Sequence, residues 1–133
     1  MARPPTWTYD GIRAGAVLGS ASLTVDNGFV ERWLRLYAGE PDTRPELPAG
    51  MAMLIVMRSY AQAVSPRPPG NVHASQRLTI HRAPRVGERL TTTVRCQDKE
   101  MKKGRRWVHL AIETLGEGGE PCYQGIITSI WAR

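Results

Sequence analysis

The hydrophobic pattern of the first half of the chain is that of helices. One set of apolar residues recurs at helical spacing and consists of Phe29, Trp33, Leu36 and Tyr37. This stripe predicts an amphipathic helix, for which Thr24 or Asp26 would provide the cap. The segment from Met51 to Val64 is apolar on nearly every side and predicts a second helix. Because a helix without a polar face must be enclosed by other elements, we expect it at the centre of the fold.

The rest of the chain has the two-residue repeat of strands. The small apolar segment 15–25 predicts a first strand. Four later segments predict further strands, at 71–82, 87–98, 105–115 and 122–131. A charged hairpin loop is expected at 99–104, and three prolines exclude a helix from the loop at 39–48. We therefore predict an α+β fold in which a curved antiparallel sheet of about five strands wraps around one long buried helix.

Length and composition predict a soluble single domain. The 133 residues suit one domain spanning 1–133, with residues 1–11 as a flexible arm because Pro4 and Pro5 oppose regular structure. Cys96 and Cys122 are the only cysteines, and the N-terminus has no apolar leader, so we expect a reducing, cytoplasmic location. No apolar run has the roughly 20 residues that a membrane span needs, so no membrane association is expected.

The net charge of +6 lies entirely in the second half of the chain. Residues 1–66 carry six Lys/Arg and six Asp/Glu, whereas residues 67–133 carry twelve and six. Such an excess suits either a solvated surface or an anionic ligand such as a phosphorylated cofactor. Nucleic acid is a third possibility, but the chain lacks interleaved aromatic residues and any recognised binding module. We therefore expect no nucleic acid partner.

One segment resembles a known family. Val72 to Leu90 reads VHASQRLTIHRAPRVGERL, and its characteristic positions are His73, Gln76, His81, Arg82, Pro84, Gly87 and Glu88. It resembles the passage from helix to sheet in MaoC-like hydratases and dehydratases. The resemblance implies the hotdog fold. It is greatest to the N-terminal repeat of peroxisomal hydratase 2 and to the non-catalytic subunit of mycobacterial heterodimeric hydroxyacyl dehydratases.

The family resemblance implies an acyl-thioester ligand, carried by coenzyme A or by an acyl carrier protein. No further cofactor and no metal are expected. The implied partner is a second hotdog, either another copy or a catalytic MaoC-like protein, so that a homodimer and a heterodimer both remain open. The resemblance also implies that five positions contact substrate: Gly50, Met51, Leu54, His73 and Gln76.

The catalytic residues of the family are only partly present. In MaoC-like proteins an acid precedes a histidine by five residues, and a Gly at the start of the buried helix donates its N–H to the thioester oxygen. Here Glu40 matches the acid and Gly50 the donor, but Pro45 stands where the histidine belongs. The chain is thus interpreted as the substrate-binding, catalytically incomplete half of an (R)-specific enoyl hydratase/3-hydroxyacyl dehydratase.

Two alternatives remain open. In the first, the chain is a complete hydratase or thioesterase that uses a loop carboxylate, Glu40 or Asp42, as its base. In the second, it is a non-enzymatic interaction protein that retains only the fold. The histidines do not separate these alternatives: the even spacing of His73 and His81 predicts one shared strand face, and their separation of about 26 Å is too large for a common metal.

Overall fold

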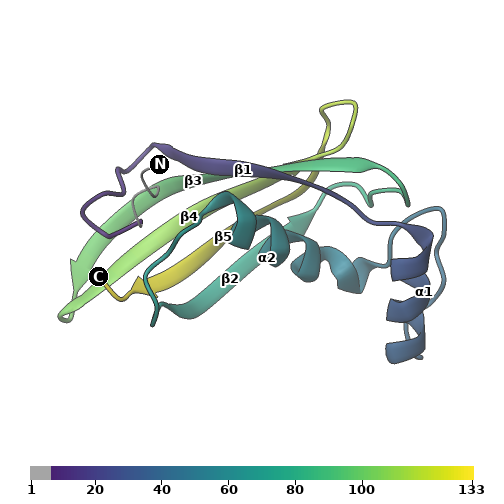
Figure 1. Ribbon diagram of the computed structural model, residues 1–133, viewed down its shortest axis with the longest axis horizontal. Helices are drawn as coiled ribbons and strands as arrows, with labels where there is room; N and C mark the ends of the chain where they lie inside the picture. Colours follow the sequence, from purple (N-terminus) through teal and green to yellow (C-terminus); the bar gives the residue numbers. More distant parts are fainter. Residues whose placement is uncertain (1–6) are drawn as a thin grey trace, which may run out of the picture.

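Five antiparallel strands form one sheet that curves around a central helix (Figure 1). The structure is a computed structural model that describes residues 7–133. Along the chain its elements are β1 (Val17–Thr24), α1 (Asn27–Leu36), the 3₁₀ turn η1 (Ala49–Met51), α2 (Ala52–Ala63), β2 (Val72–Ile80), β3 (Arg89–Lys102), β4 (Arg105–Leu115) and β5 (Pro121–Trp131). The strand order is β1-β3-β4-β5-β2, so β1 and β2 form the two edges. The predicted α+β architecture is confirmed.

The core lies between α2 and the inner face of the sheet. Ile55 and Val56 of α2 are each 1% exposed, and Val94 and Leu110 of the central strands are fully buried. The alternation along β3 and β4 explains this, since every second side chain faces the helix. We expected α2 to be enclosed on all sides, but the sheet covers only one side of it. On the other side Arg58 is exposed, and the apolar side chains of Leu54 and Met57 are only half-buried.

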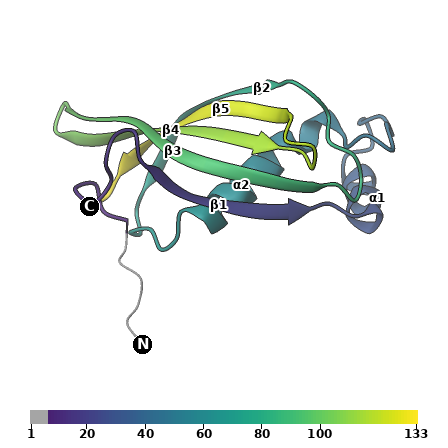
Figure 2. The ribbon, with the colours of Figure 1, turned by 90° about the horizontal axis from the view of Figure 1, so that it is seen from above.

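The strand β3 extends further than its predicted end at residue 98, whereas β4 has its predicted bounds. The segment expected as a loop, 99–104, is strand up to Lys102, and only Lys103 and Gly104 form the turn. Both turn residues have positive φ angles, 53° and 72°, which is typical of the tight turns that match strand twist. The resulting hairpin projects at the end of the molecule opposite to α1 (Figure 2).

The segment after residue 6 packs against the sheet. The Trp7 N–H donates to the Pro66 carbonyl, and the Trp131 indole donates to the Trp7 carbonyl at 2.7 Å. The Tyr9 N–H donates to the Arg133 carbonyl. Of the expected N-terminal arm, residues 7–11 thus make defined contacts, and residues 1–6 lie outside the described part of the chain.

One glycine lets α2 approach the edge strand β1. A Cβ atom on Gly19 would collide with the backbone carbonyl of Ala63, at the last turn of α2. Backbone atoms cannot move aside as a flexible side chain can. The contact between α2 and β1 therefore requires glycine at this position.

We predict that Gly19→Ala lowers the free energy of unfolding by about 1–3 kcal/mol, because the added methyl forces the helix away from the strand. Gly39→Ala is the matched control, since a Cβ there meets no atom within 4 Å. Urea denaturation of both variants measures the difference. Equal stability of the two variants would contradict the close packing of β1 on α2.

Candidate functional site

The candidate site lies at the N-terminus of α2. The helix is preceded by the turn η1, and the Gly50 N–H of that turn donates to Glu40 Oε1 at 2.8 Å. A Cβ on Gly50 would come within 2.7 Å of Glu40 Oε2, so the glycine provides the room for this carboxylate. The partial positive charge of a helix N-terminus favours a carboxylate there. Glu40 thus acts as a helix cap supplied from ten residues upstream.

The Pro-rich loop that carries Glu40 is fastened to the turn between β2 and β3. The Leu47 N–H donates to the Pro84 carbonyl, and the Val86 N–H donates to the Pro45 carbonyl, each at 2.8 Å. Glu46 and Arg85 form an isolated antiparallel bridge at the same place. Pro45, which stands where the family resemblance expects histidine, therefore has a structural role in this bridge.

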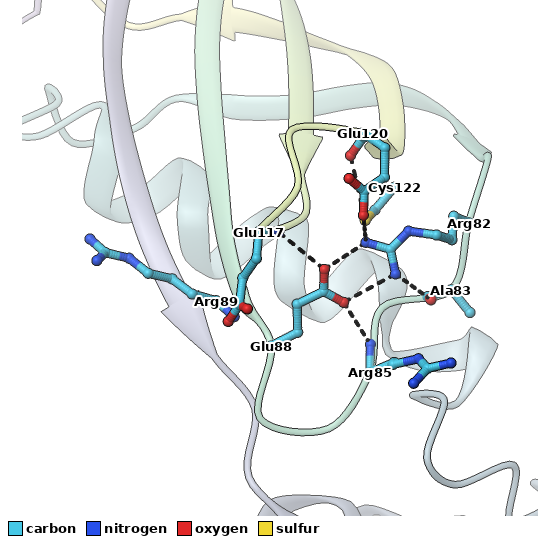
Figure 3. A network of polar contacts seen from close by, with 8 residues as sticks. All are labelled: Arg82, Ala83, Arg85, Glu88, Arg89, Glu117, Glu120 and Cys122. Carbon is cyan, nitrogen blue, oxygen red and sulfur yellow. Dashed lines mark hydrogen bonds and ion pairs between the residues drawn. The ribbon is translucent and has the colours of Figure 1, made fainter.

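An ion-pair network holds the same turn against the end of the sheet (Figure 3). Arg82 donates to both carboxylate oxygens of Glu88, at 2.6 and 3.1 Å, and lies 2.8 Å from Glu120. Glu88 also accepts the backbone N–H groups of Arg85 and Glu117. The Arg82 guanidinium and these amides hold the pKa of Glu88 near 2, well below its usual 4.5.

Asp42 is placed differently from Glu40. Its carboxylate faces solvent and forms a fork-like pair with Arg44, with distances of 2.6 and 2.9 Å. The hydrogen bonds from Arg44 lower the pKa of Asp42 to about 2. A carboxylate of such low basicity is a poor proton acceptor near neutral pH. Of the two loop carboxylates, only that of Glu40 therefore contacts Gly50.

The predicted substrate-binding residues do not converge on one cavity. Met51 is fully buried, and Leu54 lines a crevice of about 30 Å³ together with Phe29 and Arg58. That volume is roughly a tenth of a small ligand pocket. A larger hollow, of about 440 Å³, opens on the sheet face opposite to α2, and none of the predicted site residues lines it.

His73 and Gln76 lie on the edge strand β2 and are exposed. β2 begins beyond the C-terminal end of α2, so His73 is separated from Gly50 by about the length of the helix, roughly 18 Å. The structure does not bring these two residues together. Gln76 pairs with Ile127 and occupies the middle of the same strand.

The prediction that His73 and His81 share one face is wrong. A register shift between His73 and Ser75 breaks the alternation, so that His73 lies opposite the buried Ser129. His81 lies beyond the end of β2 and bonds to Gln124 at 2.7 Å, on the other face. Period-two counting from sequence cannot detect a bulge, which is why the prediction failed.

The network around Arg82 was not predicted from the sequence. Arg82 and Glu88 are both positions of the family resemblance, yet their pairing depends on the turn that brings residues six apart into contact. Gly116 is part of the same arrangement, because a Cβ there would collide with Arg82 and Glu88. The turn residues Pro84 and Gly87, which lie between Arg82 and Glu88, are the sequence signal that could have indicated this contact.

Other chemistry is limited within residues 7–133. Burial raises the pKa of the Cys96 and Cys122 thiols, so both stay protonated near neutral pH. No group of three or more His, Cys, Asp or Glu residues within the described residues is arranged to hold a metal. No helix among them has the length and apolarity of a membrane span.

Solved structures share this architecture. The MaoC-like dehydratase from Rhodospirillum rubrum matches 96% of this chain and 98% of its own, with a TM-score of 0.75 and 18% identity. The monoamine oxidase regulatory protein from Archaeoglobus fulgius matches 95% and 94%, with a TM-score of 0.80 and 13% identity. The chain has the hotdog fold.

The HadBC complex, a 3R-hydroxyacyl-ACP dehydratase from Mycobacterium tuberculosis, contains a similar hotdog. It matches 88% of this chain and 96% of its own, with a TM-score of 0.66 and 14% identity. No protein-family model matches the sequence, and no curated protein matches it. The likeness is therefore one of fold.

We predict that Glu40→Ala lowers the free energy of unfolding by about 1 kcal/mol, because the N-terminus of α2 loses its acceptor. Glu40→Gln should cost less, since its amide oxygen still accepts the Gly50 N–H. Glu46→Ala, an exposed carboxylate in the same loop, is the control. Chemical denaturation measures all three variants, and a Glu40→Ala variant as stable as the control would contradict the capping role.

A second prediction concerns pH. Because the pKa of Glu88 is lowered on folding, the unfolded chain binds the additional proton, and stability falls as the pH decreases from about 4.5 to about 2. The pair contributes on the order of 2 kcal/mol above that range. The wild type should therefore be more stable than Glu88→Gln at pH 7, and the difference in their free energies of unfolding should be much smaller at pH 3. A constant difference between the two proteins would show that Glu88 does not titrate as described.

Proposed function

We propose that this hotdog binds acyl thioesters and forms the catalytically incomplete half of an (R)-specific enoyl hydratase or 3-hydroxyacyl dehydratase. The ligand would be an acyl group carried by coenzyme A or by an acyl carrier protein, with no further cofactor. The proton transfers would be performed by a second hotdog. The proposal is supported by the MaoC-like structural neighbours and by the hydrogen bond between Gly50 and Glu40 at the N-terminus of α2.

The contact between Glu40 and Gly50 carries the proposal. Hydration of an enoyl thioester needs a base, an acid and N–H donors for the thioester oxygen. The Gly50 N–H, the expected donor, already donates to Glu40 Oε1 at 2.8 Å. The expected base and the expected donor are therefore hydrogen-bonded to each other, and neither is free for a substrate. Pro45, in place of the expected histidine, has no group that can transfer a proton.

The exposed edge of the sheet supports association with a second hotdog. β2 pairs with β5 on one side only, and eight of its nine residues are exposed. Val72 and Ile80, at its two ends, are apolar and about half exposed. Because an unpaired strand edge favours pairing with another chain, we propose that β2 joins the partner's sheet. The HadBC neighbour is itself a complex.

One observation favours a second candidate function, an interaction protein without a thioester ligand. Met51 is fully buried, and the crevice beside Leu54 holds only about 30 Å³. An acyl chain would need that crevice to widen. One structural neighbour is a regulatory protein by name, which is consistent with this candidate.

We predict that the purified chain alone hydrates crotonyl-CoA no faster than its Glu40→Gln variant, whereas both proteins bind a saturated acyl-CoA. Absorbance of the enoyl thioester follows turnover, and titration calorimetry follows binding. Addition of an active MaoC-like hotdog partner should restore hydration.

Two results would contradict the proposal in different ways. Fast turnover by the lone wild type that is lost in Glu40→Gln would identify a complete enzyme with Glu40 as its base. Absence of binding to any acyl thioester, with or without the partner, would favour the interaction protein.

A further inference from the structure

The face of the sheet that points away from α2 carries the hollow of about 440 Å³, a volume within the range of small-molecule sites. It lies over β3, β4, β5 and β2, which run side by side in Figure 2. Its floor includes Ala111 and Ile126, which are half-buried, and the exposed residues Arg77, Arg95 and Glu113 also line it. We call this feature the outer hollow.

One row of paired residues crosses the outer hollow from strand to strand. Arg77 of β2 pairs with Ile126 of β5, Ile126 pairs with Ala111 of β4, and Ala111 pairs with Arg95 of β3. Side chains that are paired in this way share one face of the sheet. Because neighbouring strands lie about 4.8 Å apart, the Cα atoms of the two arginines are roughly 14 Å apart. The row therefore has a cation at each end and an apolar floor between them.

The charge of Arg95 is compensated by its surroundings. Arg95 lies diagonally across from Glu113, and the Cα atoms of such diagonal neighbours are roughly 7–8 Å apart, within reach of two long side chains. The Arg95 Nη1 also donates to the Gly15 carbonyl at 2.8 Å. Arg95 and Glu113 together thus present a donor and an acceptor with no net charge.

Arg77 has no such compensation. Its diagonal neighbours on β5, Gln124 and Thr128, are neutral, and so are Ser75 and Thr79 on the same face of its own strand. β2 is an edge of the sheet, so no further strand lies on its other side. Within residues 7–133, Arg77 forms no ion pair with a carboxylate. The outer hollow therefore has one uncompensated cation, at its β2 end.

Hydrogen bonds on both sides hold the Gln124 amide in place at the wall of the outer hollow. His81 Nε2 donates to Gln124 Oε1 at 2.7 Å, and Gln124 Nε2 donates to Glu113 Oε2 at 2.6 Å. The Glu113 carboxylate is thus bound to an amide of the neighbouring strand. A ligand would meet this wall already formed, which lowers the cost of ordering side chains on binding.

We propose that the outer hollow binds a small organic acid with one carboxylate and an apolar body. The carboxylate pairs with the Arg77 guanidinium, whose planar donors match the two carboxylate oxygens. The apolar body covers Ile126 and Ala111 and ends beside Arg95. This site lies on the opposite face of the sheet from the N-terminus of α2, and it does not depend on the proposed function.

Charge and shape argue against two other occupants. A phosphate monoester carries roughly 1.5–2 negative charges at pH 7 and therefore needs a second uncompensated cation, whereas the outer hollow offers one. A second copy of the chain packed on this face would bury three charged side chains for the contact of two apolar residues. Burial of charges is costly, and stacked sheets are instead held by interdigitating apolar side chains.

The test follows the amide resonances of the labelled protein while sodium octanoate is added as the probe. We expect saturable shifts at Ala111 and Ile126. Arg77→Gln should weaken octanoate binding by roughly fivefold or more, because a charge-assisted pair is lost. Arg35→Gln is the matched control, since Arg35 is exposed in the last turn of α1 and lies outside the outer hollow. The control should bind octanoate within about twofold of wild type.

A second variant tests the shape of the site without changing its charge. Ala111→Leu places a larger side chain on the floor of the outer hollow, so octanoate should bind more weakly while thermal unfolding stays close to that of the wild type. Octyl phosphate and octylamine are parallel probes, and both should bind more weakly than octanoate.

Several results would overturn the inference. Equal octanoate binding by Arg77→Gln and the wild type would show that Arg77 does not hold the carboxylate. Tighter binding of octyl phosphate than of octanoate would contradict a site for a single charge. Octanoate shifts confined to Leu54 and its neighbours would place the ligand beside α2, which overturns this site and leaves the proposed function intact. The absence of any saturable shift below the concentration at which octanoate forms micelles overturns it as well.

Discussion

The hydrogen bond between the Glu40 carboxylate and the Gly50 amide is the interaction on which the account of this protein depends. At 2.8 Å it places a negative charge at the positive end of α2, the helix around which the sheet curves. The same bond joins the Pro-rich loop to the start of α2. Under the proposed function it also occupies the amide that would bind a thioester oxygen.

The surroundings of that contact are built from turns. The loop at Pro45 is bridged to the β2–β3 turn, and Arg82 and Glu88 fasten that turn to the end of β4 and β5. Three segments distant in sequence are thus joined: the Pro-rich loop, the β2–β3 turn and the β4–β5 turn. Most of these contacts use backbone groups or paired charges.

The sequence predicted the fold well, and the family resemblance named two residues of the candidate site. Helical spacing located α1, a segment apolar on nearly every side located α2, and alternation located β3, β4 and β5, because these signals depend on burial against a single core. The bulge that separates His73 from Ser75 and the close approach of Gly19 to Ala63 have no such signal, since both depend on tertiary contacts. Glu40 and Gly50 could be named from the resemblance, but their mutual hydrogen bond required the path of the loop.

The central claim is that the Gly50 amide stays bound to Glu40 when a thioester is present. The most direct measurement is an amide-resolved NMR titration of the labelled protein with crotonyl-CoA. We expect resonances near Leu54 to shift while that of the Gly50 amide remains at its hydrogen-bonded position. The Glu40→Ala substitution should move the Gly50 resonance without ligand. A Gly50 resonance that shifts in saturable proportion to crotonyl-CoA, with release of Glu40, would contradict the account.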